Sequence, residues 1–151
     1  MAYLITFFIS MIPIIELRGA VPFAISQGIP LWQALPLAVF ANMLPVPIIF
    51  FFARHVLEWG KDKPIIGGFF TWCLDKGHKG GAKLEKIAGD RGIFIALVLF
   101  VGIPIPGTGA WTGTLAASFL DWDFKKSVLS VIAGLLLAGV IMATASYVVG
   151  L

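Results

Sequence analysis

Three long segments of the chain, residues 19–53, 92–120 and 127–151, carry no Lys, Arg, Asp, Glu or His side chain. Each is longer than the roughly 20 apolar residues that cross the hydrocarbon core of a bilayer as a helix. Nearly all the charged side chains lie between these segments. The pattern predicts a polytopic α-helical membrane protein.

The first segment is too long for a single crossing, because as one helix it would extend about 50 Å. A polar cluster at residues 26–30, with Gly and Pro, predicts a turn within it. We therefore expect a transmembrane helix over residues 31–54. Asn42, Pro45 and Pro47 should kink it, because proline lacks an N–H donor and its ring clashes with the preceding turn.

Residues 1–27 precede that turn and contain two short apolar arms, residues 3–12 and 19–26, around a centre that holds Glu16 and Arg18. Neither arm is long enough to span a bilayer alone. Two arrangements stay open: one broken spanning helix, or a re-entrant helical hairpin.

Residues 55–91 hold most of the charge, and their lysines and arginines outnumber the acids. A Lys/Arg excess predicts a cytoplasmic loop. Its aromatic residues near Phe69 and Trp72 predict a short helix in the membrane interface, ending at the glycines of residues 77–81. A second short helix, residues 82–88, is expected to end at Gly89.

Residues 92–120 form a second broken segment, because two prolines and three glycines interrupt it between residues 102 and 109. Its arms, residues 93–101 and 110–119, are again short. Asp121 and Asp123 then precede a full transmembrane helix over residues 124–149, since carboxylates favour a helix N-terminus.

The same order therefore occurs twice: a broken segment, a short polar link and a full helix. The first full helix enters the cytoplasm at Arg54 and the last leaves it beside Lys125 and Lys126, so the two halves have opposite orientation. Paired broken segments in inverted halves are typical of transporters with a site at the bilayer midplane. We expect one all-α membrane domain, residues 1–151, with two full transmembrane helices and two re-entrant hairpins in an inverted repeat.

Composition agrees with a membrane location and disfavours several other functions. Hydrophobic residues make up 59% of the chain and charged residues 13%, against about 25% charged residues in soluble domains. Cys73, His55 and His78 stand apart, so we expect neither an intrachain disulfide nor a metal site. Catalytic pairs of carboxylates and a Ser–His–Asp order are not visible, so we expect no enzyme, no cofactor and no nucleic-acid partner.

The first motif, residues 16–22, reads Glu-Leu-Arg-Gly-Ala-Val-Pro and brings two charges to bilayer depth. Each costs roughly 2.5–3.5 kcal/mol on insertion scales. Glu16 and Arg18 cannot face each other on a helix but can do so across an extended turn. Gly19 would turn the backbone there, and Pro22 would start the next half-helix. Either the two form a structural ion pair, or Glu16 exchanges a proton or cation while Arg18 binds an anionic group.

The second motif, residues 102–113, combines prolines, which lack a donor, with glycines, which leave backbone amides uncovered. A half-helix that begins near Gly109 would direct free N–H groups and its dipole at the membrane interior, which suits an anion. Close packing of small residues is the structural alternative, but it does not explain the prolines. The candidate site residues of this segment are Pro104, Pro106, Gly107, Thr108, Gly109, Trp111 and Thr112.

Together these two motifs resemble those of the bacterial and archaeal family of small multidrug export proteins, over nearly the whole chain. That family resembles, more distantly, the DedA-like membrane proteins, which have two re-entrant hairpins and are implicated in moving undecaprenyl phosphate and other lipids. The resemblance implies that Glu16 matches the acidic residue of the first hairpin, and that Pro106, Gly107 and Gly109 match the turn of the second. The chain lacks the DedA arginine at that turn, so Arg18 would bind a phosphate alone or with Arg91.

Three functions follow as hypotheses. The first is a transporter of the prokaryotic cytoplasmic membrane, coupled to protons through Glu16, that moves an anionic or amphipathic lipid-like substrate such as a lipid phosphate. The second is a small multidrug exporter in which Glu16 binds amphipathic cations. The third is a non-transporting membrane scaffold subunit. About four membrane elements hardly enclose a pathway, so we expect a homodimer in contact with membrane lipids.

Overall fold

The computed structural model describes residues 1–105, 108–120 and 122–151, with side chains except at positions 57, 70, 73, 74, 76–78, 80–85, 87 and 88. The regular structure of this part of the chain is all helical, as predicted, and no strand occurs in it. In order, the helices are α1 Ala2–Met11, α2 Glu16–Ser26, α3 Leu31–Met43, α4 Pro45–Gly60, α5 Gly67–Gly102, α6 Ala110–Phe119 and α7 Phe124–Val149.

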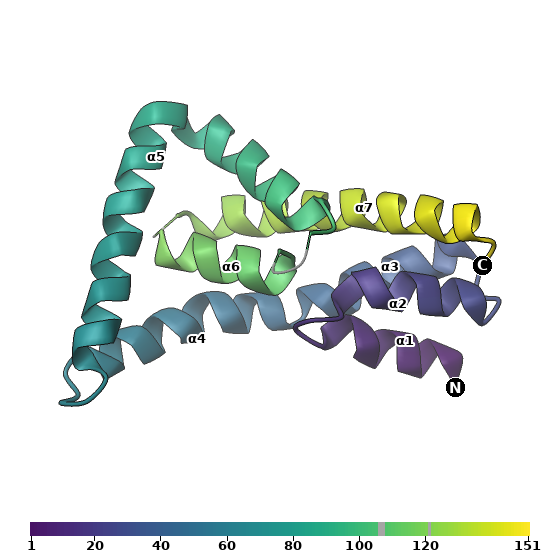
Figure 1. Cartoon of the computed structure of the whole chain (residues 1–151), viewed down its shortest axis with the longest axis horizontal. Coiled ribbons are helices and arrows are strands. Elements are labelled where there is room, and N and C mark those ends of the chain that lie inside the picture. Colours follow the sequence, from purple (N-terminus) through teal and green to yellow (C-terminus); the bar gives the residue numbers. More distant parts are fainter. Residues whose placement is uncertain (106–107, 121) are drawn as a thin grey trace.

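Two long helical units run antiparallel along the longest axis of the molecule (Figure 1). One unit is α3 with α4, which spans Leu31–Gly60 and is interrupted only at Leu44; the other is α7. Both are long and apolar enough to cross a membrane. The interruption falls directly before Pro45, at the first position of α4, where a missing N–H removes no intrahelical hydrogen bond.

The predicted end of this helix at Arg54 is wrong, because α4 continues to Gly60. Arg54 Nε lies 3.5 Å from Glu58 Oε1 one turn further on, a pairing that stabilises a helix surface. The start of α7 agrees with its prediction: the Asp123 carboxylate caps the helix by accepting a hydrogen bond from Lys126 N at 3.1 Å. Asp121 lies outside the described residues.

Two shorter helical hairpins pack against the long units and approach each other from opposite ends (Figure 1). The first consists of α1 and α2, and the second of the C-terminal part of α5 and α6. Each hairpin returns to the end at which it began. At the outer end of the first, Tyr3 Oη donates to Gln33 Oε1; at the outer end of the second, Lys126 Nζ contacts Asp90 Oδ2. Both tips therefore lie midway along the molecule.

The turn of the first hairpin differs from its prediction. The chain reverses at residues 12–15, and α2 already begins at Glu16, so the predicted roles of Gly19 and Pro22 in the turn are wrong. Both residues lie inside α2. Gly19 is needed for close packing instead, since a Cβ there would come 2.2 Å from Ile15 Cγ2. Transmembrane helices tolerate an internal proline where neighbouring groups satisfy the freed backbone.

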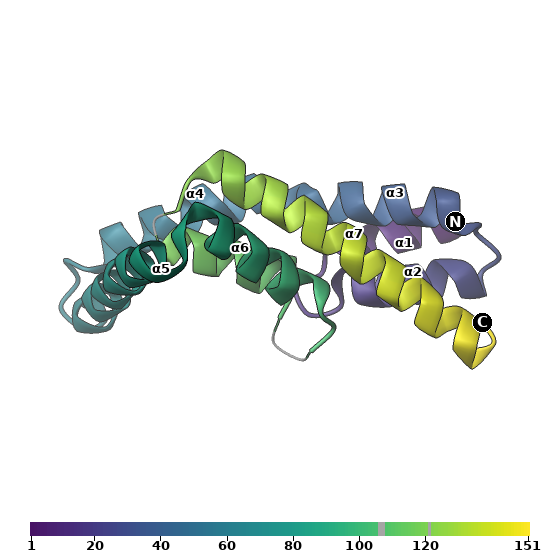
Figure 2. The same cartoon turned by 90° about the horizontal axis from the view of Figure 1, so that it is seen from above.

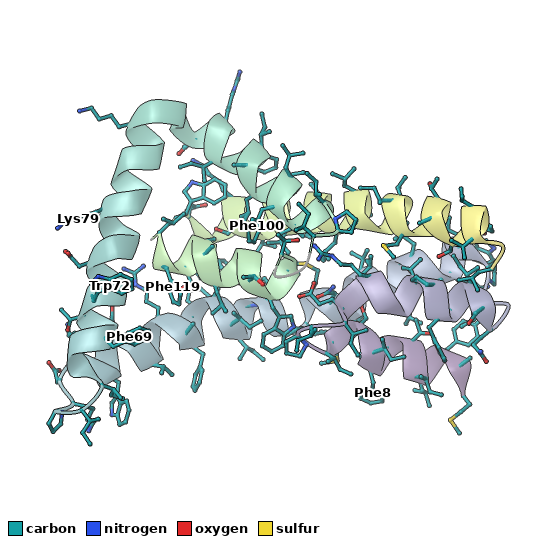
Figure 3. All side chains as sticks on the ribbon, in the orientation of Figure 1. Phe8, Phe69, Trp72, Lys79, Phe100 and Phe119 are labelled. Carbon is teal, nitrogen blue, oxygen red and sulfur yellow. The ribbon has the colours of Figure 1, made fainter. Side chains whose placement is uncertain are left out.

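Helix α5 bends at Gly89, whose φ of 66° and ψ of −179° are not helical. Its first part lies across the end of the bundle, and its second part lies along it (Figures 1 and 2). The predicted helix end at residues 77–81 is wrong, because α5 continues through these glycines, each of which costs only about 1 kcal/mol in a helix. The predicted break at Gly89 is confirmed. Phe69 and Trp72 lie exposed on the first part with stacked rings (Figure 3).

Small residues bring the helices close together. The second arm of each hairpin packs on the long unit of the other half, α2 on α7 and α6 on α4. A Cβ on Gly139 of α7 would come 2.1 Å from Leu35 Cδ1, and one on Gly134 would come 2.6 Å from Val101 Cβ. Such contacts are typical of helix packing in membranes, where glycine and alanine let backbones approach.

Many large apolar side chains lie on the surface of this molecule, and several polar side chains lie inside it among an apolar core. Phe8 points outward (Figure 3), and Phe8, Phe52 and Val140 each have more than half of their surface exposed. Polar side chains lie inside, among them Thr6, Ser10, Asn42, Thr114, Ser118, Ser127 and Ser130. An exposed apolar surface of this extent is typical of a protein that contacts lipid or another apolar surface. Together with the two long apolar units, it indicates a membrane protein.

Candidate functional site

The candidate site lies where the tip of the first hairpin meets the break of the second, midway along the molecule (Figures 1 and 2). The first turn of α2 supplies Glu16 and Arg18. The second hairpin supplies the C-terminal end of α5, the described part of the break and the N-terminal end of α6. Pro106 and Gly107, which the sequence placed in the site, lie outside the described residues.

Glu16 binds the N-terminus of α6. Its Oε2 accepts a hydrogen bond from Ala110 N at 3.1 Å, and its Oε1 accepts one from Trp111 N at 3.0 Å. The residue is only 3% exposed and has a φ of 52°, a left-handed conformation that is rare for a residue with a side chain. The carboxylate therefore satisfies two of the amides that a helix start leaves without partners.

Gly109 makes this approach possible. It is the N-cap of α6 with a φ of 139°, which favours glycine, and a Cβ there would come 2.3 Å from Glu16 Oε2. The predicted start of a half-helix near Gly109 is confirmed. Its first N–H groups do not point into open space, however, because the chain's own carboxylate occupies them.

Arg18 binds the other side of the break. Its Nη1 donates to Ile105 O at 2.9 Å, and its Nη2 lies within hydrogen-bond distance of Val101 O, Ile103 O and Thr108 Oγ1, at 3.2, 3.0 and 2.7 Å. Thr108 Oγ1 also lies 2.7 Å from Ile105 O and can donate to it. The guanidinium therefore caps the carbonyl end of α5, where the helix dipole favours a positive charge.

The two charged residues thus bind opposite ends of two helices, and each is matched in sign to the dipole that it meets. Within the described part of the chain, no direct ion pair within 4.0 Å joins Glu16 to Arg18. The interpretation of a structural pair between the two side chains is therefore wrong. Their partners are backbone groups more than 80 residues away in the sequence.

The other residues predicted for the site are distributed more widely. Thr108, Gly109 and the backbone of Trp111 contact Glu16 or Arg18 directly. Pro104 lies exposed in the break, and Thr112 lies exposed on α6. Gly19 and Pro22 lie in α2 beyond the two charges.

The candidate site residues include Trp111 but neither Asn42 nor Thr114, and all three carry buried polar atoms in the structure. Asn42 is fully buried, and within the described residues neither atom of its amide has a hydrogen-bond partner. The same holds for the Thr114 hydroxyl and the indole N–H of Trp111. The signal for Asn42 was an amide in the middle of a long segment without charge, which we had interpreted only as part of a kink.

The model of the family described as "Putative small multi-drug export protein" matches residues 16–141, from the first charge of the candidate site into α7. The chain belongs to this family. No curated protein and no solved structure matches it. The family's description indicates a role in membrane transport, which agrees with the two long apolar helical units and the exposed apolar side chains.

Proposed function

We propose that this chain is a proton-coupled transporter of the prokaryotic cytoplasmic membrane, and that its substrate is an anionic amphiphile such as a lipid phosphate. The observation that carries the proposal is the binding of the Glu16 carboxylate by the N-terminus of α6, next to the guanidinium of Arg18. A helix N-terminus with a nearby arginine suits an anionic group. In this structure the carboxylate of Glu16 occupies the position that such an anionic group would take at the N-terminus of α6.

Protonation of Glu16 would change this arrangement. A neutral carboxyl binds two N–H donors less strongly than a carboxylate does. The vacated N–H groups of α6, together with Arg18, would then suit the anionic head group of a substrate. The substrate and the Glu16 carboxylate would exclude each other, so each substrate anion would cross the membrane together with a proton.

Corresponding contacts in the two halves support an inverted repeat with two re-entrant hairpins. Tyr3 with Gln33 and Asp90 with Lys126 are equivalent contacts at opposite ends, and each joins the start of a hairpin to the start of a long helix. Likewise, α2 packs on α7 as α6 packs on α4. A pseudo-two-fold axis through the hairpin tips would generate both correspondences, and such an axis supports alternating access to a midplane site.

A flip assay in phosphatidylcholine vesicles tests the proposal. Phosphatidic acid with a fluorophore on its acyl chain is quenched by external dithionite only when it reaches the outer leaflet. We expect the full chain to accelerate quenching, more so at acidic pH, and Glu16→Gln to abolish the acceleration. Thr144→Val, an exposed change on α7 outside the candidate site, is the control and should behave as the wild type.

A second candidate function is export of amphipathic cations, which the family's description favours. In that case Glu16 would bind the cation, and the cation would compete with the two backbone N–H groups for its oxygens. Dodecyl phosphate and dodecyltrimethylammonium have the same chain and opposite charge, so their relative binding separates the two functions. A chain that binds neither and moves no lipid would instead be a scaffold.

We further propose that the transporter is a homodimer. Two long helical units and two hairpins form a thin bundle (Figures 1 and 2), and many large apolar side chains lie exposed on its helices. Crosslinking of the chain in native-like membranes tests this state. A monomer that transports at the wild-type rate would contradict it.

A further inference from the structure

Three of the buried polar side chains that lack partners within the described residues, those of Asn42, Thr114 and Trp111, lie near the level of Glu16; the indole of Trp122, directly before α7, lies elsewhere. Helices α4 and α6 run side by side in the same direction (Figure 1), and Ser118 Oγ donates to Phe50 O at 2.6 Å. Two turns back along α6 and along the unit of α3 and α4, past its interruption at Leu44, this register places Asn42 near the level of Ala110 and Trp111. The N–H groups of those two residues bind Glu16.

A second register gives the same result independently. Helices α2 and α3 are antiparallel neighbours joined by a short turn at residues 27–30. Glu16, at the start of α2, is as far from this turn as Asn42 is on α3. Asn42 therefore lies beside the tip of the first hairpin, and Thr114 lies one turn above Ala110 on α6.

We propose that the Asn42 amide, the Thr114 hydroxyl and the Trp111 indole N–H form a subsite for the oxyanion head group of a phosphate monoester amphiphile. This inference rests on the proposed function and names the groups that bind its substrate. In the present conformation these groups have no partner in the described chain, which is costly for buried polar atoms. Separation of the hairpin tips would let a head group enter, and its oxygens would accept the hydrogen bonds that are now missing.

The chemistry of the three groups fits this ligand. The amide offers two N–H donors, and the hydroxyl and the indole offer one each. These donors are neutral, so they add no competing cation beside the Glu16 carboxylate, which keeps its place on α6 in the absence of substrate. Together with the vacated N–H groups of α6 and with Arg18, they supply donors from both halves of the molecule to one anion.

Substitution of Asn42 tests the subsite. We expect Asn42→Leu, which keeps a branched side chain but no polar atom, to weaken binding of dodecyl phosphate in phosphatidylcholine nanodiscs about 10-fold, as expected for the loss of one hydrogen bond to a charged group. Asn42→Ala, which cannot overpack the core, should have the same effect. Ser118→Ala is the matched control: it removes a buried hydroxyl that has a partner, so it should lower the Tm and leave the Kd unchanged.

The outcomes separate this inference from the proposed function. The subsite alone would be overturned by the following result. The wild type binds dodecyl phosphate and Glu16→Gln binds it more tightly, but both Asn42 variants bind it with the wild-type Kd. Binding of dodecyltrimethylammonium in place of dodecyl phosphate would overturn the proposed function and the subsite with it. If the Asn42 variants also bind inorganic phosphate more weakly than the wild type, the subsite is kept and recognises phosphate in general. Equal binding of dodecanol would overturn an oxyanion site.

Discussion

The two hairpins have the same shape and opposite chemistry at their tips. The first has a short turn and carries two charges among apolar residues, Glu16 and Arg18. The second has a longer break and no charged side chain, but it leaves backbone N–H groups on one side and carbonyl groups on the other. The charges of the first tip bind the backbone groups of the second. Neither tip is satisfied without the other.

This difference explains how charges can persist at bilayer depth without pairing with each other. A carboxylate at a helix N-terminus and a guanidinium at a helix C-terminus meet partial charges of about half an elementary charge. The second hairpin supplies both ends within one break. The contact between the tips therefore stabilises the two charged side chains. Loss of the charge of Glu16 or Arg18 would in turn alter the packing of the two halves.

The largest effect on stability is expected at Gly109, where the backbone of the second tip lies closest to the Glu16 carboxylate. Gly109→Ala should destabilise the protein by about 3 kcal/mol or more, because it combines a φ that favours glycine with a clash against the Glu16 carboxylate. Gly28→Ala is the control, since Gly28 has a φ of 79° but no atom within 4 Å of the added Cβ. It should cost only about 1–2 kcal/mol. Equal losses in detergent unfolding would mean that the contact with Glu16 has no effect.

Removal of the positive charge of the first tip should have the next largest effect. Arg18→Met leaves three carbonyl groups of the second tip without their donor, and it should cost about 2–3 kcal/mol. Arg18→Lys should be intermediate, because one ammonium cannot reach all the acceptors of the planar guanidinium. Equilibrium unfolding of the three proteins checks the order. A lysine variant as stable as the wild type would contradict a role for the shape of the guanidinium.

Neutralisation of the other charge separates stability from transport. Glu16→Gln should cost only about 1 kcal/mol, because the amide oxygen still accepts one N–H bond of α6 although the amide nitrogen faces the other. The same variant should lose proton-coupled flux. Unfolding and vesicle assays on one preparation measure both. Retained flux with full pH dependence would exclude Glu16 as the coupling residue.

The smallest effect is expected at the outer ends of the hairpins. The contact there is charged in the second hairpin, between Asp90 and Lys126, and uncharged in the first, between Tyr3 and Gln33. The side-chain hydrogen bond from Lys126 lowers the pKa of the Asp90 carboxyl below its ordinary value. Its contribution to stability is therefore present above the unfolded-state pKa of Asp90 and is lost as the pH falls through the folded-state pKa. The Tm difference between wild type and Asp90→Asn should shrink to zero on acidification.

The corresponding contact of the first hairpin provides the control. Tyr3 and Gln33 are uncharged, so the Tm difference between wild type and Tyr3→Phe should stay constant over the same acidic range. A parallel pH dependence in both variants would show that global changes, and not the Asp90 contact, cause the effect.

Local signals in the sequence were sufficient for several elements. Helices α6 and α7 begin and end at the predicted residues, because proline, glycine and the Asp123 cap act on the backbone directly around them. They were not sufficient at residues 77–81, where isolated glycines stay helical, or at Gly19 and Pro22, which lie in α2. A half-helix start near Gly109 was predicted, but its pairing with Glu16 and the pairing of Arg18 with carbonyl groups of residues 101–105 were not, since backbone groups carry no residue-specific signal.

The sequence alone determined that this chain is helical and membrane-bound, and that two charges lie among apolar segments, because composition and spacing set the solvent that each segment tolerates. Only the tertiary structure decided that these charges bind the ends of α5 and α6, and that the buried amide of Asn42 has no hydrogen-bond partner within the described residues. A hydrogen bond depends on distance and direction between groups far apart in the chain, and those are fixed only when the two hairpins pack against the long helices.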